Sequence, residues 1–270
     1  MEWKILKATF KRNLIINLRA YPKDFFIGNL LTGVYTVISA LFMYKMLFDG
    51  NITEEFVQYT STGDYMGYII LGSLTYLFAV RTCLNVSRSL IIELREGTLE
   101  SLMMAPFKRI EYFMGNMLHQ TLATSFEIMV SVIIAIPFGL TFKNMNFISF
   151  LLVFIISLFG FFSLSLVLGA LMLYTRDTYI SQNTLFVGIL LLCGITFPID
   201  YLPYPLRILG KLIPVTEISN LIRGATLLGY GILEQMPRII YVVLLSLVYL
   251  VIGFKSFKYV EKIALEKIQG

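Results

Sequence analysis

The stretch FISFLLVFIISLFGFFSLSLVLGALML, residues 147–173, contains no charged side chain. It exceeds the roughly 20 apolar residues that a helix needs to cross a bilayer. Inside a bilayer only helices and closed barrels satisfy their backbone polar groups, and barrel strands are shorter and alternate apolar with polar residues. This run therefore predicts a transmembrane helix.

Other long apolar runs give the chain six expected spans. Their approximate limits are 25–47, 66–91, 112–140, 147–173, 179–198 and 238–257. Of the 270 residues, 57% are hydrophobic and 14% are charged, whereas soluble domains carry about 25% charged residues. Cys83 and Cys193 lie in apolar runs and are interpreted as packing residues, so no metal site is expected. The sequence predicts an all-α integral membrane protein with one transmembrane domain over 1–270.

The distribution of basic residues predicts the orientation. If both termini are cytoplasmic, the segments on that side hold 14 Lys and Arg, and the external segments hold 4. An excess of Lys and Arg marks cytoplasmic loops. We therefore expect a multi-pass plasma-membrane protein with cytoplasmic N- and C-termini. The net charge of +5 then reflects contact with lipid headgroups, and no nucleic-acid partner is expected.

Residues 1–22 are expected to form an amphipathic helix that ends at Pro22. One edge is apolar and aromatic, and most basic residues lie on the other side. The apolar edge consists of Trp3, Leu6, Phe10, Leu14 and Leu18. A basic helix of this kind suits the membrane interface. The alternative is a solvated helix that packs on a partner.

A short helix is expected over 98–105, in the loop between the second and third spans. Gly97 permits a sharp turn, Thr98 is a good N-cap, and Glu100 favours the first helical turn. Pro106 ends the helix.

One edge of this short helix is apolar and is formed by Leu99, Leu102 and Met103. Such a helix suits a groove on a cytoplasmic partner, and the spacing fits an ordinary loop helix equally well. Replacing Leu102 or Met103 by Asp tests the partner role.

Two parts of the chain resemble the ABC type-2 transporter permeases, most of all their drug- and antibiotic-export branch. The first resembles their cytoplasmic loop, and it comprises Glu96-Gly97-Thr98-Leu99-Glu100, Leu102, Pro106, Arg109 and Gly115. The second resembles their proline-rich stretch before the last span, and it comprises Phe197-Pro198, Leu202-Pro203, Ile213-Pro214-Val215-Thr216 and Arg223. The entry helix and six-span layout extend the resemblance over nearly the whole chain.

The resemblance implies a non-catalytic permease that pairs with a second permease, identical or not. Each copy docks on a separate ATP-binding subunit, which holds ATP and Mg. The loop would act as a coupling helix through Glu96, Gly97, Thr98, Leu99, Glu100, Leu102, Met103 and Pro106. Residues 199–236 would form a re-entrant extracellular hairpin that includes Pro198, Pro203, Pro214, Glu217 and Arg223. The export branch implies an amphiphilic cargo: a drug, antibiotic, peptide or lipid-linked molecule.

The residues themselves fit two of these expectations, the separate ATP-binding subunit and the hairpin that does not cross the membrane. No phosphate-binding Gly-x-x-x-x-Gly-Lys-Ser/Thr motif occurs, since Gly210-Lys211 has Pro205 in place of the first glycine. Residues 213–230 include Glu217 and Arg223 and are too polar for a span.

The third span carries polar residues on one helix face: Asn116, Gln120, Thr124, Glu127 and Ser131. A charge at mid-membrane costs at least about 2.5 kcal/mol, so Glu127 is expected to face protein or water. This face is a candidate pathway or subunit interface, or else a structural contact. His119 is interpreted as a packed polar residue.

The second span places Arg81, Asn85 and Arg88 on one face near its cytoplasmic end. Arg81 and Asn85 are candidate pathway or interface residues, although both arginines can extend to headgroups. Helix rise places Arg81 about 10 Å nearer the cytoplasm than Glu127. An Arg81–Glu127 pair is therefore not predicted.

Alternative functions stay open at this point. Within transport, the cargo could be a polysaccharide or teichoic-acid precursor, or sodium ions. Outside ATP-driven transport, the chain could be an ion-coupled carrier dependent on Glu127. It could also be an intramembrane lipid-modifying enzyme, which needs a cluster of polar residues at one depth.

Overall fold

The computed structural model describes residues 3–20, 22–48, 54–104, 109–142, 144–175 and 179–269. These residues form helices joined by turns, without a strand among them. The α-helices are α1 (Trp3–Ile15), α2 (Pro22–Phe48), α3 (Glu54–Thr60), α4 (Tyr65–Arg95), α5 (Leu99–Met104), α6 (Arg109–Ala135), α7 (Phe147–Thr175), α8 (Tyr179–Leu192), α9 (Tyr204–Lys211), α10 (Pro214–Arg223) and α11 (Ile232–Gln269). The all-α prediction is confirmed.

Among the described residues, four helices are long and apolar enough to cross a membrane. Their spanning parts are Tyr65–Ser89, Arg109–Phe138, Phe147–Thr175 and Ile232–Val260. They correspond to the second, third, fourth and sixth expected spans. The first expected span, 25–47, coincides with α2, which has 27 residues. The chain is thus a multi-pass membrane protein, and six remains the predicted number of crossings.

The fifth expected span, 179–198, is not one continuous helix. Helix α8 has 14 residues and ends at Leu192, which gives a length of about 21 Å. Gly194 follows with a φ of +64°, a left-handed conformation that ends the helix. The apolar run continues through this break, which is why hydrophobicity alone overestimated the helix.

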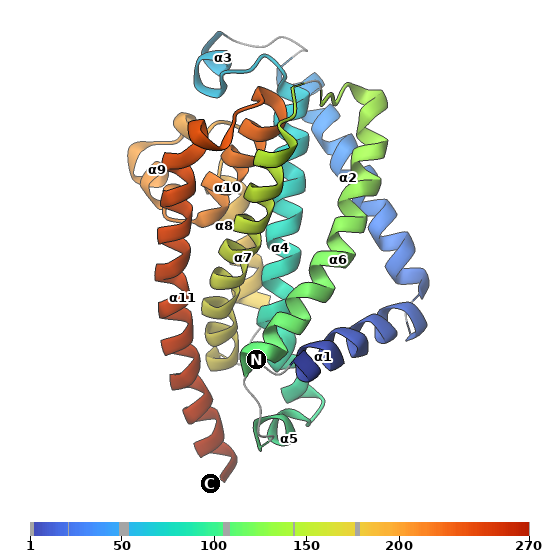
Figure 1. Ribbon diagram of the computed structural model, residues 1–270, viewed down its shortest axis with the longest axis vertical. Helices are drawn as coiled ribbons and strands as arrows, with labels where there is room; N and C mark the ends of the chain where they lie inside the picture. The colour runs from blue at the N-terminus through green and yellow to red at the C-terminus, as the bar shows by residue number, and fades with distance from the viewer. Residues whose placement is uncertain are drawn as a thin grey trace.

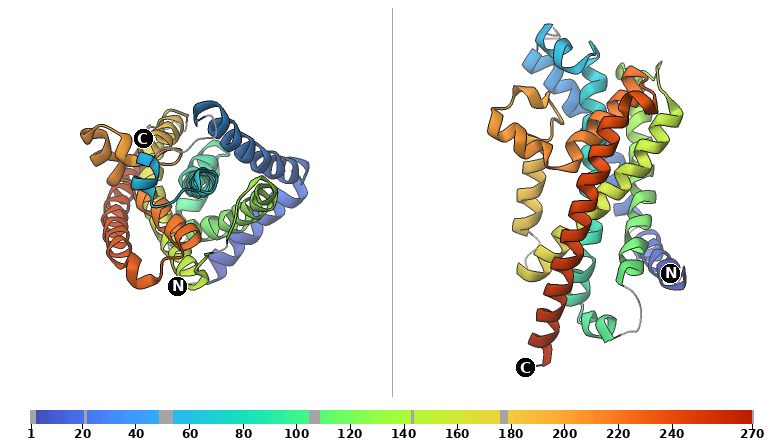
Figure 2. Two further views of the ribbon diagram at one scale, coloured as in Figure 1. Left: turned by 90° about the horizontal axis from the view of Figure 1, so that it is seen from above. Right: turned by 60° about the vertical axis from the view of Figure 1, so that its left-hand side comes forward.

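Helix α4 lies at the centre of the bundle. Seen along the bundle in Figure 2, α4 is surrounded by α2, α6, α7 and α10, and it contacts each of these helices as well as α8. Helices α7 and α11 pack along their length, with Gly253 close to Leu166. Small residues permit this close approach. In a membrane, van der Waals packing of this kind holds helices together, because lipid removes the hydrophobic driving force between them.

The two ends of the bundle differ in the short helices they carry. Helix α5, α1 and the C-terminal end of α11 lie toward one end, which we call the α5 end (Figure 1). Helices α3, α9 and α10 lie toward the other end, which we call the α3 end. Both termini therefore lie toward the α5 end. The assignment of that end to the cytoplasm stays a prediction.

Helix α1 packs across α6 with a partly polar face. Leu6 and Thr9 are buried, whereas Trp3 and Leu18, expected on the same apolar edge, are exposed. A Cβ atom on Gly115 of α6 would lie 2.8 Å from the carbonyl oxygen of Leu6. The helix thus docks on its own chain, and its position at the membrane interface stays a prediction.

Replacing Gly115 by valine should loosen α1 from α6. The added atoms would collide with the α1 backbone, and overpacking of this kind costs about 1–3 kcal/mol. We expect a lower thermal midpoint and a lower fluorescence anisotropy of Trp3, the one tryptophan of the chain. A Gly188→Val control adds the same atoms at a position where a Cβ would have no neighbour within 4 Å beyond its own helix backbone. Equal behaviour of the two variants would contradict the close packing.

Candidate functional site

The carboxylate of Glu93 joins four elements at the α5 end. Its Oε1 accepts hydrogen bonds from Arg12 Nη2 of α1 at 2.7 Å and from the Tyr112 hydroxyl of α6 at 2.9 Å. Its Oε2 accepts a hydrogen bond from Thr98, the residue that precedes α5. The side chain of Glu93 is only 3% exposed. We call Glu93, Arg12, Thr98 and Tyr112 the Glu93 cluster.

Hydrogen bonding outweighs burial at Glu93. Burial alone would raise the pKa of the carboxyl, but the hydrogen bonds from Thr98, Arg12 and Tyr112 stabilise the anion and lower its pKa overall. At Arg12, burial alone would lower the pKa, and the hydrogen bond to Glu93 is the main reason that it is raised instead. The cluster is therefore charged at neutral pH.

Acidification should weaken the Glu93 cluster. A carboxyl whose folded pKa is lowered contributes stability above its unfolded pKa, here ordinarily 4.5, and loses it as the pH falls through the folded value. We expect the thermal midpoint of the purified protein to fall as the pH is lowered from neutral to below about 4.5. The Glu93→Gln variant should start lower and change less. Parallel curves for the two proteins would contradict this role.

Polar side chains of α1 and of the π-helical turn that continues it, Ile16–Ala20, pair with polar side chains of α6. Asn13 Nδ2 donates to Asn116 Oδ1 at 2.7 Å, and Asn17 Nδ2 lies 3.3 Å from His119 Nε2. The ring of Phe10 packs edge-on against His119, with 6.1 Å between centroids. Asn116 and His119 are both buried. The packed role predicted for His119 agrees with these contacts.

A second set of contacts joins α4 to the polar face of α6. Asn85 Nδ2 donates to Gln120 Oε1 at 2.7 Å, and Gln120 Nε2 donates to Thr124 Oγ1 at 2.8 Å. Deeper in the bundle, Arg81 Nη2 lies 3.3 Å from Glu127 Oε1. The structure therefore joins Asn85, Gln120 and Thr124 in one set of contacts and Arg81 and Glu127 in another, whereas the sixth candidate, Asn116, bonds Asn13.

The Arg81–Glu127 contact corrects the sequence prediction, which left these residues about 10 Å apart along the helices. The separation of about 10 Å applies to the backbone positions, and the long arginine side chain can extend over part of it. The separation also assumes parallel helices, whereas α6 leans away from α4 (Figure 1).

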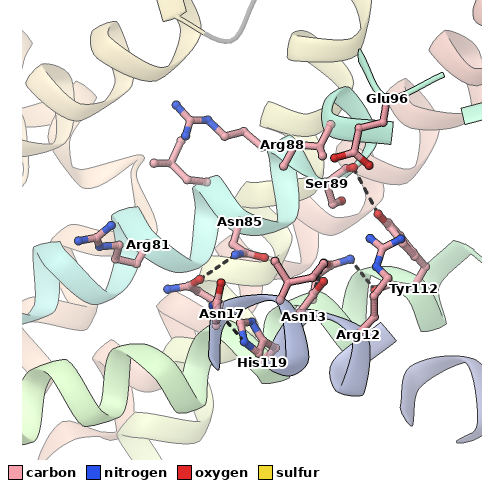
Figure 3. A pocket seen from close by; sticks show the side chains of 15 residues that line it. Arg12, Asn13, Asn17, Arg81, Asn85, Arg88, Ser89, Glu96, Tyr112 and His119 are labelled. Atoms are coloured by element: carbon pink, nitrogen blue, oxygen red, sulfur yellow. Dashed lines mark hydrogen bonds between the residues drawn. The ribbon is translucent and has the colours of Figure 1, made fainter. Parts of the chain in front are cut away.

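Between these contacts lies a cavity of about 410 Å³ lined by α1, α4 and α6. We call it the polar cavity; Figure 3 shows its lining side chains. Its polar lining includes Arg12, Asn13, Asn17, Arg81, Asn85, Arg88, Glu96, Asn116, His119 and Gln120. Among the described residues, no group of three or more His, Cys, Asp or Glu could hold a metal ion.

The predicted coupling residues divide between the cavity, the turn and α5. Glu96 lines the polar cavity, and Gly97 adopts a φ of +72°, as the sharp turn requires. Leu102 is half-buried against an apolar cluster of its own bundle, whereas Met104 is 81% exposed. The side chains of Leu99, Glu100 and Met103, and Pro106 as a whole, lie outside the described residues.

The hairpin region at the α3 end is built around prolines and one buried arginine. Pro198 precedes a 3-10 turn over Ile199–Tyr201, Pro203 precedes α9, and Pro214 opens α10. Glu217 in the first turn of α10 lies 4.0 Å from Arg238. The expected pair of short helices is therefore present, and its entry into the outer leaflet stays a prediction.

Arg223, at the end of α10, binds the chain where α8 ends. Its Nη1 and Nη2 donate to the carbonyl oxygens of Gly194 at 2.9 Å and Ile195 at 2.7 Å, and its Nε donates to that of Tyr68 at 3.1 Å. The guanidinium also stacks on the Tyr68 ring, 3.5 Å from the centroid. Gly194 and Ile195 lie in the turn after α8, and their buried backbone carbonyls thus find a donor from another element.

Sequence reasoning missed Glu93, Arg12, Tyr112, Asn13 and Asn17. One signal was available, because Thr9, Asn13 and Asn17 recur every four residues and predict a polar stripe along the N-terminal helix. The apolar edge of the same segment is the stronger pattern and masks this stripe. The partner of Glu93 could not be read from spacing, since Arg12 lies 81 residues away.

The fold and the site define a helical multi-pass membrane protein with a polar cavity beside a short loop helix. The family model described as ABC-2 type transporter matches residues 6–227, most of the chain. The chain belongs to this family and is a permease subunit of an ABC transporter, a class of transporter in which the permease associates with an ATP-binding subunit. A search of curated proteins gave no match.

Proposed function

We propose that this permease forms the membrane part of an ATP-driven exporter that moves an amphiphilic molecule out of the cytoplasm or the inner leaflet. ATP and Mg bind a separate subunit, and two permeases, identical or not, complete the pathway. The observation that carries the proposal is the Glu93 cluster. Through hydrogen bonds it connects Thr98, the residue before α5, with α1, α4 and α6.

In this proposal α5 docks on the ATP-binding subunit and follows its closure. Displacement of α5 pulls on Thr98 and therefore on the Glu93 carboxylate. Because that carboxylate also holds Arg12 and Tyr112, α1 and α6 move relative to α4. These three helices line the polar cavity, so the motion changes access to it.

The polar residues of α4 and α6 support a role for this cavity in the transport pathway. Arg81 lies half-exposed beside the cavity, whereas its partner Glu127 is buried. The pairing argues for a structural ion pair over a proton-carrying group. An ion-coupled carrier would lose coupling on replacement of Glu127 by Gln, whereas an ATP-driven exporter would retain ATP-dependent transport.

Co-purification tests the proposal most directly. The tagged full-length chain is solubilised gently from native membranes, and mass spectrometry identifies the proteins that accompany it. We expect an ABC ATPase in near-stoichiometric amount. A second permease beside it would establish a heterodimer. Recovery of the folded chain without an ATPase would count against the proposal and favour a gradient-driven carrier or an intramembrane enzyme.

A further inference from the structure

A further cavity, of about 220 Å³, opens between α6 and α7. These two helices pack against α4 rather than against each other, and Figure 1 shows α4 lying between them. Residues of α4, among them the buried Leu71 and Phe78, form the floor of the cavity. The half-buried residues of its walls are Ile128 and Val132 of α6 and Phe150 and Phe154 of α7. The cavity is therefore a groove on the surface of the bundle, which we call the α6–α7 groove.

The α6–α7 groove lies at the depth of the lipid chains, in the half of the bundle nearer the α3 end. The span on α4 begins at Tyr65, and helix rise places Leu71 about 9 Å and Phe78 about 20 Å along it. The hydrocarbon core of a bilayer is about 30 Å thick. The walls of the groove also belong to spans, Arg109–Phe138 on α6 and Phe147–Thr175 on α7. The groove therefore faces hydrocarbon rather than water.

Two threonines supply the hydroxyl groups in the described lining of the α6–α7 groove, and both are buried. Thr75 Oγ1 donates to the carbonyl oxygen of Leu71 at 2.8 Å, and Thr226 Oγ1 donates to that of Ile222 at 2.7 Å. Each hydroxyl proton is thus used within its own helix. A buried water needs 2–4 polar partners, and an engineered cavity of about 150 Å³ lined by Leu, Ile and Phe stays dry and binds apolar molecules. The larger α6–α7 groove therefore suits an apolar occupant.

We propose that the α6–α7 groove holds one acyl chain of a membrane lipid from the leaflet at the α3 end. Lipid chains are the apolar material present at this depth, and an empty groove would forfeit the dispersion contacts of its lining. A transmembrane helix is about 10–12 Å wide with its side chains, so a recess of about 220 Å³ has no room for a helix of a second permease. Ile222 of α10 also lines the groove, so the chain contacts the hairpin region as well as the spans.

Photo-crosslinking in vesicles tests this proposal. The full-length chain is reconstituted in dioleoylphosphatidylcholine with a trace of phosphatidylcholine that carries a diazirine midway along one acyl chain, and mass spectrometry maps the labelled residues. We expect stronger labelling of Phe150 and Phe154 than of Ile240 and Leu244, which are exposed on α11 at a similar depth. The reason is that a chain held in the groove stays beside the half-buried phenylalanines, whereas lipid on the exposed face of α11 exchanges freely.

Two variants fill the groove from the α6 wall. Val132→Phe and Ile128→Phe each place extra atoms where the chain would lie, and each should abolish the excess labelling of Phe150 and Phe154. Filling a cavity commonly stabilises a protein, so the thermal midpoint in detergent should match or exceed that of the original chain. Ile133→Phe is the matched control, because Ile133 is the next residue along α6, is 59% exposed and should leave the labelling unchanged.

The outcomes decide between an acyl chain and other occupants. Labelling of Phe150 and Phe154 no stronger than that of Ile240 and Leu244 would overturn the proposal, as it would if a second permease covered the groove. Unchanged labelling in both filled variants would also overturn it. Thr75→Val removes a hydroxyl and keeps the side-chain shape, so labelling should persist, and its loss would mean that the groove recognises a polar group instead. Labelling of the groove in a chain that recruits no ATPase would leave this site standing and remove the exporter.

Discussion

Replacement of Arg223 by alanine is expected to abolish accumulation of folded protein in the membrane. The arginine is 4% exposed and donates hydrogen bonds to three backbone carbonyls, those of Tyr68, Gly194 and Ile195. Each buried acceptor left without a donor costs about 1–3 kcal/mol. Gly194 O would keep the Tyr68 hydroxyl as a donor, so the loss falls on the other contacts and on the stacked guanidinium, which together are a sizeable share of the 5–15 kcal/mol that typically stabilises a protein, as an order of magnitude.

Membrane-fraction yield and the thermal midpoint in detergent measure this effect. Arg223→Lys keeps the charge but lacks the planar fork, so we expect a partial rescue. Gly72→Ala provides an independent route to the same loss, because its Cβ would collide with the Arg223 guanidinium and the Ile195 carbonyl. Arg238→Ala, whose side chain is 56% exposed, serves as the control. If Arg223→Ala behaved as Arg238→Ala does, the contacts of Arg223 would have no structural importance.

Replacement of Met104 by aspartate is expected to reduce ATP-dependent transport by at least about tenfold while leaving the permease folded. Among the described side chains of α5, Met104 is the exposed apolar one, and a charge placed in an apolar groove on a partner costs several kcal/mol. Leu102 faces the apolar cluster of its own bundle. Its replacement by alanine should lower the thermal midpoint instead.

Reconstitution with the ATP-binding subunit distinguishes these two residues. Transport, ATPase stimulation and the thermal midpoint are measured for Met104→Asp, Leu102→Ala and the original chain. Tyr259→Asp, an exposed position on α11, controls for an added surface charge at the same end. Normal transport by Met104→Asp would remove α5 from the coupling contact. Loss of the fold in that variant would contradict the exposure of Met104.

Hydrophobic runs were sufficient to locate the long helices. An uncharged stretch such as 147–173 must avoid water along its whole length, so its folding as a transmembrane helix depends little on the rest of the chain. The polar face of α6 was also predictable, because Asn116, Gln120 and Glu127 repeat with helical spacing. Local sequence carries both signals.

The contacts that make up the site depend on packing between distant segments. Arg12 and Glu93 meet only because α1 crosses α6 beside the end of α4. The break after Leu192 depends on Gly194, whose carbonyl is satisfied by Arg223 from 29 residues away. The hydrophobicity pattern predicted neither the Arg12–Glu93 contact nor the break after Leu192, because both involve polar atoms in apolar surroundings.

The contacts of Arg223 also fix a positive charge in the bundle, and the proposed entry of the hairpin region into the outer leaflet would place that charge within the electric field of the membrane. Its described partners are carbonyl groups and the Tyr68 ring, and these leave the charge in place. It lies beside the first turns of the α4 span. Moving one elementary charge through the whole potential corresponds to about 2.3 kcal/mol per 100 mV. If α10 shifts along the membrane normal during transport, the rate of that step depends on voltage even when the cargo is neutral.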